Sequence, residues 1–246
     1  MADFTLYYWS APFRGQFVRA VLAYADKTWT EPGDDAIVAL MEGPIEAMPV
    51  PFMGPPVLVD ETAGVALSQT PAILFYLGET LGLLPAAPAL RALTLNVAID
   101  ANDLIDDLTL DGGRLMWTDA RWRDFIPRLR KWMGLWEDLG RRHGLSADAG
   151  YLLGGDAPGV ADVVTATLWS TLNERFPPIA AMLEDAAPAT AGLTRRVSAL
   201  PALADLTARA RREYGDLYCG GRIEQSLRQV LRTAGASAAF AHEGPP

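Results

Sequence analysis

The sequence predicts a small α/β domain followed by an all-helical domain. Strand-like and helix-like segments alternate over residues 4–81, whereas every periodic segment after residue 86 has helical spacing. A short Pro/Ala stretch at residues 84–88 separates the two parts. We therefore expect an α/β domain over residues 1–85, a helical bundle over 86–234 and a flexible tail over 235–246.

The α/β domain is expected to begin with a strand and a helix. Residues 4–9 are β-branched or aromatic, which is typical of a strand. Ser10 and Pro12 then form a loop, and either residue can begin a helix. The helix is indicated by apolar residues that recur at helical spacing: Phe17, Val18, Val21, Leu22 and Ala25.

The rest of this domain is expected to contain a hairpin and a second helix. Glycine and proline recur over residues 31–54, and no element is assigned there. Residues 56–60 and 64–67 read as two strands around a turn. Residues 70–81 return to helical spacing through Ile73, Leu74 and Leu77.

The helical domain is predicted from four apolar stripes. Each stripe repeats at the spacing that places side chains on one face of a helix. The stripes are Leu90, Leu93, Val97, Leu104 and Leu108; Ile126, Leu129, Trp132, Leu135, Trp136 and Leu139; Val160, Val163, Val164 and Leu168; and Leu203, Leu206 and Ala210.

Composition and charge exclude several classes of function. Half of the 246 residues are hydrophobic, which is typical of a globular protein. The net charge of −9 argues against nucleic acid or an anionic membrane as a partner. Because the chain has only Cys219, His143 and His242, neither a disulfide framework nor a metal centre rich in Cys or His is expected. No signal peptide or membrane-spanning run is recognised, so we expect a cytoplasmic protein.

Four segments, taken in order, resemble motifs of the cytosolic glutathione transferases. They are LYYW with RGQFVR (6–9 and 14–19), PPVL (55–58), SQTPAILFYL (68–77) and GGDAPGVAD (154–162). PPVL is similar to the family's Val-cisPro-x-Leu turn, and the last segment to the capped start of a core helix. The resemblance is to a bacterial-type member and implies a thioredoxin-like first domain, a helical second domain and a homodimer.

The resemblance implies conjugation of glutathione, as a co-substrate, to a small apolar electrophile in detoxification. A hydroxyl that donates a hydrogen bond to sulfur favours the thiolate. Tyr8 matches the activating residue of Tyr-type members, and Ser10 that of Ser-type members. The alternative is that Tyr8 is a core aromatic residue and Ser10 a helix cap. No cysteine lies near residues 8–14, which argues against the Cys-type branch.

The resemblance also assigns residues that bind glutathione. It makes Pro56 a cis proline whose preceding backbone pairs with the cysteinyl part of the ligand. Pro55 has no N–H, so it can accept one hydrogen bond but cannot donate the other. Gln69 and Thr70, at a strand-to-helix junction, would hold the γ-glutamyl carboxylate; the alternative is an ordinary helix cap.

The glycyl carboxylate has few candidate partners. Residues 1–85 contain three basic and ten acidic side chains, a net charge of −7, and no basic residue lies between Lys27 and Arg91. Arg14 is the nearest candidate, with Trp29 as a neutral possibility. Because basic residues are scarce here, one alternative is a protein that keeps the transferase fold, has a binding or structural role and makes little or no use of glutathione. A glutathione-dependent peroxidase, isomerase or ether-cleaving enzyme is a further alternative.

The electrophile is expected between the domains. Candidate lining residues are Phe13, Leu115, Met116 and Trp117, although aromatic residues at helical spacing usually belong to a core. The acidic residues Asp100, Asp103, Asp106 and Asp107 are expected on one helix, as a solvated face or as a contact to the ligand ammonium across a dimer. Gly159 stands where the family has Ser or Thr, and Asp162 is expected to satisfy the amides at the start of its helix.

Overall fold

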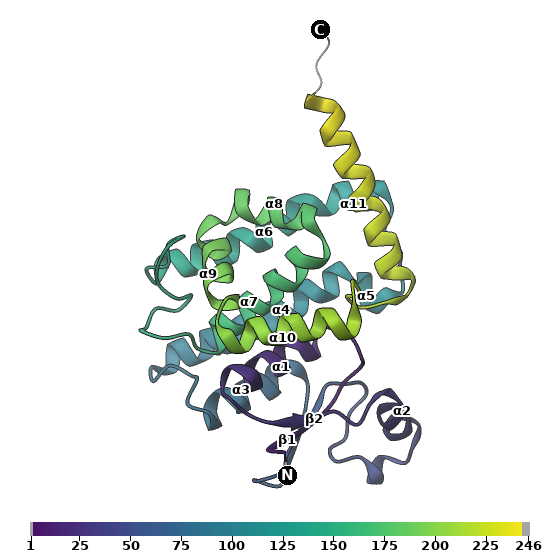
Figure 1. The fold of residues 1–246 in the computed structure, drawn as a ribbon, viewed down its shortest axis with the longest axis vertical. Coiled ribbons are helices and arrows are strands. Elements are labelled where there is room, and N and C mark those ends of the chain that lie inside the picture. Colours follow the sequence, from purple (N-terminus) through teal and green to yellow (C-terminus); the bar gives the residue numbers. More distant parts are fainter. Residues whose placement is uncertain (1, 243–246) are drawn as a thin grey trace.

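Four short strands form one mixed sheet in the N-terminal part of the chain, and helices cover it (Figure 1). The computed structural model describes residues 2–242. The strands are β1 (Phe4–Tyr7), β2 (Trp29–Thr30), β3 (Val57–Asp60) and β4 (Val65–Ser68), in the order β2-β1-β3-β4. β2 is parallel to β1, whereas β3 is antiparallel to both β1 and β4. The predicted hairpin over residues 56–67 is confirmed.

Two helices of this domain match the predicted periodicity. They are α1 (Gly15–Tyr24) and α3 (Thr70–Thr80), which begins directly after β4. α1 is buried on almost every side, because all of its residues from Gly15 to Leu22 are buried. It therefore packs between the sheet domain and the helical domain.

The unassigned region over residues 31–54 contains α2 (Asp34–Glu42) and a single turn of 3₁₀-helix, η1 (Ile45–Ala47). Gly33, Gly43 and Pro44 flank this helix, so the segment reads as a loop in the sequence. Only Ile37 of α2 is buried, so few core contacts fix where the helix begins. Its start instead depends on Gly33, whose positive φ of 93° suits glycine, and on acidic residues in the first turn.

In the second part of the chain the described residues form helices and no strand, as predicted. Its helices are α4 (Pro88–Leu108), α5 (Leu110–Gly113), α6 (Asp119–Arg142), α7 (Val160–Arg175), α8 (Pro177–Ala186), α9 (Pro188–Ser198), α10 (Pro201–Tyr214) and α11 (Gly221–His242). The predicted boundary at residues 85 and 86 lies in the connection between α3 and α4. Of the expected tail, residues 235–242 continue the backbone of α11, and residues 243–246 lie outside the described residues.

α8 and α9 were not expected as separate helices. Each begins with a proline, at Pro177 and Pro188, where the missing N–H causes no loss. Most of the buried residues of α9 are small, so large apolar residues do not recur along it as they do in the predicted helices.

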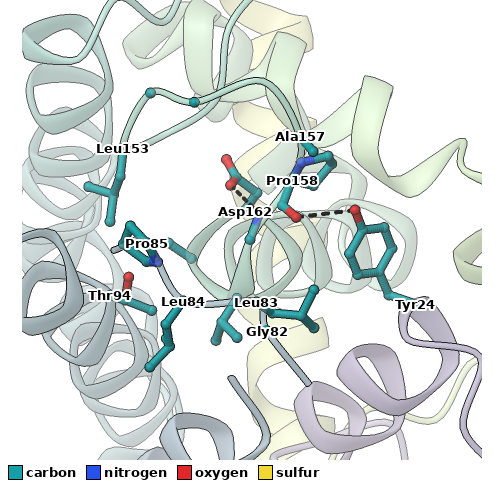
Figure 2. Close-up of a pocket in the computed structure, with 15 residues that line it drawn as sticks. Tyr24, Gly82, Leu83, Leu84, Pro85, Thr94, Leu153, Ala157, Pro158 and Asp162 are labelled. Atoms are coloured by element: carbon teal, nitrogen blue, oxygen red, sulfur yellow. Dashed lines mark hydrogen bonds between the residues drawn. The ribbon is translucent and has the colours of Figure 1, made fainter. Parts of the chain in front are cut away.

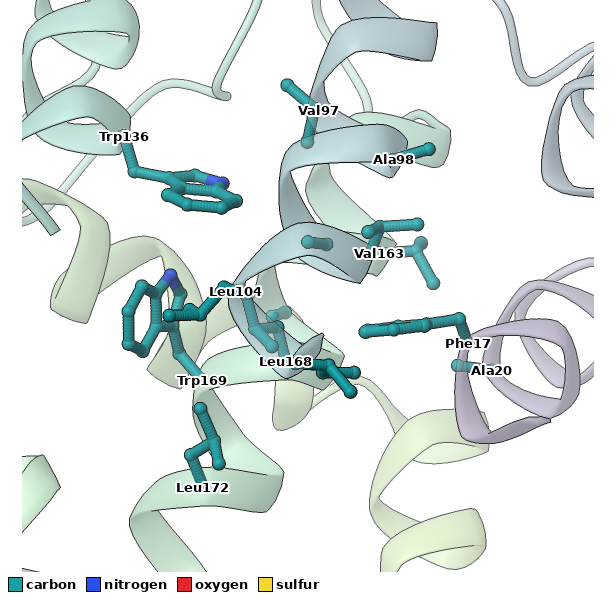
Figure 3. Packing of buried hydrophobic residues seen from close by; sticks show 14 of the residues in the cluster. Phe17, Ala20, Val97, Ala98, Leu104, Trp136, Val163, Leu168, Trp169 and Leu172 are labelled. Carbon is teal, nitrogen blue, oxygen red and sulfur yellow. The ribbon is translucent and has the colours of Figure 1, made fainter. Parts of the chain in front are cut away.

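One hydrophobic core crosses the domain boundary (Figure 3). Phe17 and Ala20 on α1 pack toward Val163 and Leu168 on α7. On the far side of α7, Trp169 packs edge-on against Trp136 of α6, with ring centroids 5.6 Å apart. None of the helices described is long and apolar enough to cross a bilayer.

Candidate active site

The register of the sheet brings three predicted segments to one edge. Tyr7 at the end of β1 pairs with Val57 at the start of β3, and Val57 pairs with Ser68 at the end of β4. Neighbouring strands lie about 4.8 Å apart. Tyr8, Pro56 and Gln69, each next to one of these paired residues, therefore lie at the same edge of the sheet.

Tyr8 is buried where β1 turns toward α1. Its side chain packs on Gly15, and a Cβ atom at that position would lie only 2.2 Å from Cδ1 of Tyr8. Burial raises the pKa of Tyr8 to about 12, although the charge of Arg14 and the amides of Gly15 and Arg14 act to lower it. The hydroxyl is therefore protonated at neutral pH and can donate a hydrogen bond.

Arg19 holds the loop that follows Tyr8. Its guanidinium is buried and donates to the carbonyl oxygens of Ala11 (2.8 Å) and Trp9 (3.1 Å). It also forms a bidentate ion pair with Glu31, through Nη2 to Oε2 (2.6 Å) and Nε to Oε1 (2.9 Å). Glu31 also accepts a bond from the indole of Trp29 (2.8 Å), so this candidate for the glycyl carboxylate is already paired. Sequence reasoning did not identify Arg19 or Glu31 as site residues.

Ser10 is exposed and bonded to α2. Its backbone amide and its hydroxyl both donate to Oδ1 of Asp34, at 2.9 and 3.0 Å. The alternative that Ser10 caps the next helix is wrong, because α1 begins at Gly15 and its N-cap residue is Arg14. The hydroxyl proton of Ser10 is thus directed at a carboxylate rather than at an open site.

Arg14 reaches from the sheet domain to α4. Its Nε donates to Oδ1 of Asn102 (2.9 Å), its Nη2 forms an ion pair with Asp106, and its guanidinium lies 4.6 Å from the centroid of the Phe13 ring. Among the acidic residues expected on one helix, Asp106 therefore contacts the loop after β1. Asp107 instead pairs with Arg128 at 2.6 Å.

The other predicted binding residues lie at the starts of β3 and α3. The peptide bond between Pro55 and Pro56 is cis, as the resemblance implied. Gln69 is exposed and has a positive φ of 73°, and Thr70 is the buried first residue of α3. The first turn of α3 has no side-chain cap, and Pro71 has no N–H. The amide of Ile73 donates to the carbonyl oxygen of Gln69 (3.0 Å), which leaves the amides of Thr70 and Ala72 for an anion.

Tyr218, in the loop between α10 and α11, faces the same region from the helical domain. Its ring packs edge-on against Phe13 at 5.3 Å, and its buried hydroxyl has no hydrogen-bond partner among the described residues. Glu224 holds this loop by accepting bonds from the amides of Tyr218 (3.0 Å), Cys219 (2.9 Å) and Gly220 (2.7 Å). Burial raises the pKa of Cys219 to about 12, so its thiol is protonated at neutral pH. No sequence signal marked Tyr218.

The space beside Phe13, one of the residues expected to line an apolar pocket, is small. The space beside Phe13 and Tyr218 is only about 10 Å³, no more than a water molecule occupies. Trp117 belongs to the core, where it packs against Trp122 at 5.4 Å and donates to the carbonyl of Leu108. Leu115 is half exposed. The described residues contain no cluster of three or more His, Cys, Asp and Glu side chains that could hold a metal ion.

A larger cavity, of about 270 Å³, lies at the other end of α1 (Figure 2). Tyr24 on its wall donates to the carbonyl of Pro158 (3.1 Å). Asp162 accepts bonds from the amides of Gly159 (2.9 Å) and Leu152 (2.7 Å), which confirms its predicted structural role. Because α1 rises about 1.5 Å per residue, this cavity is separated from the Tyr8 end by most of the length of the helix.

Comparisons with known proteins converge on one family. Residues 93–230 match the family model described as the C-terminal domain of glutathione S-transferase. No curated protein sequence matches the chain. Among solved structures, the chain is similar to NaGST-2, with 23% identity and a TM-score of 0.67 over 85% of this chain and 97% of that one. It is also similar to the monomeric glutathione S-transferase Na-GST-3 of the human hookworm Necator americanus, with 20% identity and a TM-score of 0.67 over 84% of this chain and 97% of that one. A third similar structure is the Pi-class glutathione S-transferase of Onchocerca volvulus, with 16% identity and a TM-score of 0.69 over 89% of this chain and 98% of that one. At these identities the solved structures show the shared fold.

Proposed function

Because the chain belongs to the glutathione S-transferase family, we propose that it is a cytoplasmic detoxification enzyme that conjugates the thiol of glutathione to a small apolar electrophile. The observation that carries the proposal is the shared edge of the sheet at which Tyr8, Pro56 and Gln69 lie. This edge combines a hydroxyl donor, an extended backbone and a helix N-terminus, which are the groups that a thiol-bearing peptide with carboxylates requires.

In the proposed reaction Tyr8 stabilises the thiolate. Its pKa of about 12 keeps the hydroxyl protonated, so it acts as a hydrogen-bond donor and not as the base. The thiol proton leaves to water, and the hydrogen bond lowers the thiol pKa from its free value of about 8–9. A sulfur lone pair then forms the new bond to the electrophilic carbon, and the leaving group departs with the electron pair of the bond that breaks. Ser10 is the second candidate and would first have to release Asp34.

The carboxylates of glutathione are assigned to two places. The first turn of α3, at Gln69 and Thr70, is proposed to bind the γ-glutamyl carboxylate. Arg14 is proposed to bind the glycyl carboxylate and would exchange its ion pair with Asp106 for one with the ligand. Pro55 can offer only its carbonyl oxygen to the cysteinyl part.

Two observations favour one other function. Arg14 is already paired with Asp106, and Pro55 has no N–H to donate to the ligand. A protein with this fold that binds glutathione weakly, or not at all, would serve as a binding or structural protein. Each lost charge-assisted hydrogen bond weakens binding by about 1.5–3 kcal/mol, or roughly tenfold or more in affinity.

Calorimetric titration with glutathione separates these two functions. The enzyme is expected to release or absorb heat on binding and to gain thermal stability at millimolar ligand, and no response in either measurement would refute the proposal. The pKa of the bound thiol is then measured from the ultraviolet absorbance of the thiolate. We expect Tyr8→Phe to raise this pKa by at least one unit, which corresponds to a loss of about 1.4 kcal/mol in the stabilisation of the thiolate. Ser10→Ala is expected to leave the thiol pKa unchanged. Tyr7→Phe, at the adjacent position on β1, is the matched control.

A second copy of the chain is the proposed partner. An apolar hollow of about 710 Å³ lies between α3 and α4, lined by Phe75, Leu95 and Ile99 among others. Ile99 is 42% exposed there. Light scattering after size exclusion is expected to give a dimer that Ile99→Glu dissociates, whereas Leu115→Glu, at an exposed site elsewhere, leaves the mass unchanged. A monomeric wild-type protein would contradict this assignment.

A further inference from the structure

An exposed apolar surface lies on α2 and on the 3₁₀ turn η1 that follows it. Four of the eight large hydrophobic side chains that are exposed among the described residues fall within residues 38–53. Three of them belong to α2 and η1: Val38, Met41 and Ile45 are 40%, 41% and 64% exposed. In Figure 1, α2 lies beside the sheet and away from the helices of the second part of the chain. We call the surface formed by these three side chains the α2 face.

The α2 face is presented by a helix that is anchored on its other side. Val38 and Met41 are three residues apart in α2, so they lie on the same side of the helix. Ile37 is completely buried beneath α2. Asp34, in the first turn, accepts hydrogen bonds from the amide and the hydroxyl of Ser10, at 2.9 and 3.0 Å. The face is therefore held in place before any partner binds, which lowers the entropic cost of binding.

Uncompensated carboxylates border the α2 face. Residues 31–64 contain seven acidic residues and no Lys, Arg or His. Asp35 and Glu42 lie three residues before and four residues after Val38, so they share its side of α2. Both are exposed, as is Glu46 in η1. None of these three carboxylates takes part in an ion pair within the described residues.

We propose that the α2 face is a docking surface for a basic amphipathic segment of another protein, with aliphatic side chains on one side and lysine or arginine beside them. The aliphatic side chains pack on Val38, Met41 and Ile45, and the cations pair with the bordering carboxylates. Charge complementarity selects this partner. A second copy of the chain is disfavoured because it carries the same net charge of −9. This docking does not depend on glutathione binding.

The test measures binding of the labelled peptide LKKLLKLLKKLLKL to the full chain by fluorescence anisotropy. At helical spacing the leucines of this peptide lie on one side and its lysines on the other. The counterpart LEELLELLEELLEL keeps the apolar side and reverses the charge. We expect the lysine peptide to bind at least about tenfold more tightly than the glutamate peptide, and to weaken as salt is raised, because exposed charges are screened.

The apolar contribution is tested with Val38→Asn/Met41→Gln. This variant removes two of the three apolar contacts and is expected to weaken the lysine peptide about tenfold. Leu135→Gln changes an exposed apolar residue of α6 and is the matched control, for which we expect unchanged affinity. Because all three side chains are exposed, the melting temperatures of both variants should match that of the wild type.

The charge contribution is tested with Glu42→Gln/Glu46→Gln. We expect this variant to bind the lysine peptide about fivefold more weakly and with a smaller dependence on salt. Asp205→Asn/Glu213→Gln removes the same charge from exposed positions of α10 and is the matched control. The control separates a local ion pair from a general effect of net charge, and its affinity should stay within about twofold of the wild type.

Hydrogen exchange locates the bound peptide, which is expected to protect the amides of α2 and η1. The proposal is overturned if the lysine peptide does not bind at millimolar concentration, or if the two peptides bind equally. Equal effects of the α2 variants and their controls, or protection confined to other helices, would overturn it as well. If the wild type self-associates and Val38→Asn/Met41→Gln abolishes this, the face is covered by a second copy and the proposal is wrong.

Discussion

Removing the guanidinium of Arg19 is expected to destabilise the chain and to release the loop after β1. Arg19→Met keeps much of the buried stem but deletes the donors to Glu31, Trp9 and Ala11. Breaking a buried ion pair from one side costs about 3–5 kcal/mol. The side chain of Glu31 is 23% exposed and can partly regain water, so we expect the lower figure, about 3 kcal/mol. For a chain of this size that corresponds to a melting temperature lower by roughly 6–12 °C.

The assay is urea unfolding followed by tryptophan fluorescence, together with a thermal scan. The double variant Arg19→Met/Glu31→Leu removes the uncompensated charge but still leaves the two loop carbonyls without a donor, which costs about 1–3 kcal/mol. It should therefore lie between the single variant and the wild type. A loss below about 1 kcal/mol in Arg19→Met, or a double variant no more stable than the single one, would refute this account.

Two further predictions concern glycine and pH. Gly15→Ala should destabilise the chain by at least about 2 kcal/mol in urea unfolding, because the new Cβ would lie 2.2 Å from the ring of Tyr8. Gly134→Ala, inside α6, should instead stabilise it by about 0.5–1 kcal/mol, because the new Cβ would meet no atom within 4 Å beyond the neighbouring backbone of its own helix. Equal effects would contradict the close packing at Tyr8. Burial acts to raise the pKa of Glu224, but hydrogen bonds from Gly220, Arg228 and neighbouring amides outweigh it, and the pKa is lowered from 4.5. This contribution to stability is present above pH 4.5 and is lost as the pH falls through the lowered pKa, so Glu224→Gln should flatten the acid limb of a stability–pH curve; an unchanged acid limb would refute it.

The elements that the sequence predicts correctly are those that contribute large apolar side chains to the core. The strands of the hairpin, α1 and α3 carry apolar residues at a regular spacing, so both their type and their order could be predicted. α2 buries only Ile37 and is flanked by glycine and proline, and α9 buries mostly small residues of its own, so neither helix carries a run of large buried apolar residues. Tertiary contacts position α9 instead, chiefly those with α7.

In the candidate site, residues that belong to local motifs could be predicted from the sequence, whereas residues that depend on distant partners could not. Tyr8, Pro56 and Gln69 were found through local motifs, and the pairing of β1, β3 and β4 then places them at one edge. Arg19 and Tyr218 were missed because their roles depend on partners far away in the sequence. Glu31 is 12 residues from Arg19, and Tyr218 meets Phe13 from the opposite end of the chain.

The burial of α1 also bears on what a break in the chain would do. Phe17 and Ala20 belong to the first domain, yet they complete the core around α7. A protease that cuts between α3 and α4 would therefore produce two fragments that stay associated. Each fragment made alone would expose one half of a shared apolar surface, so we expect neither to be soluble until both are present together. The segment at residues 84–88 therefore links two parts of a single cooperative unit. If the helical domain were exchanged for that of another protein, the residues of α1 that pack against it would have to be changed as well.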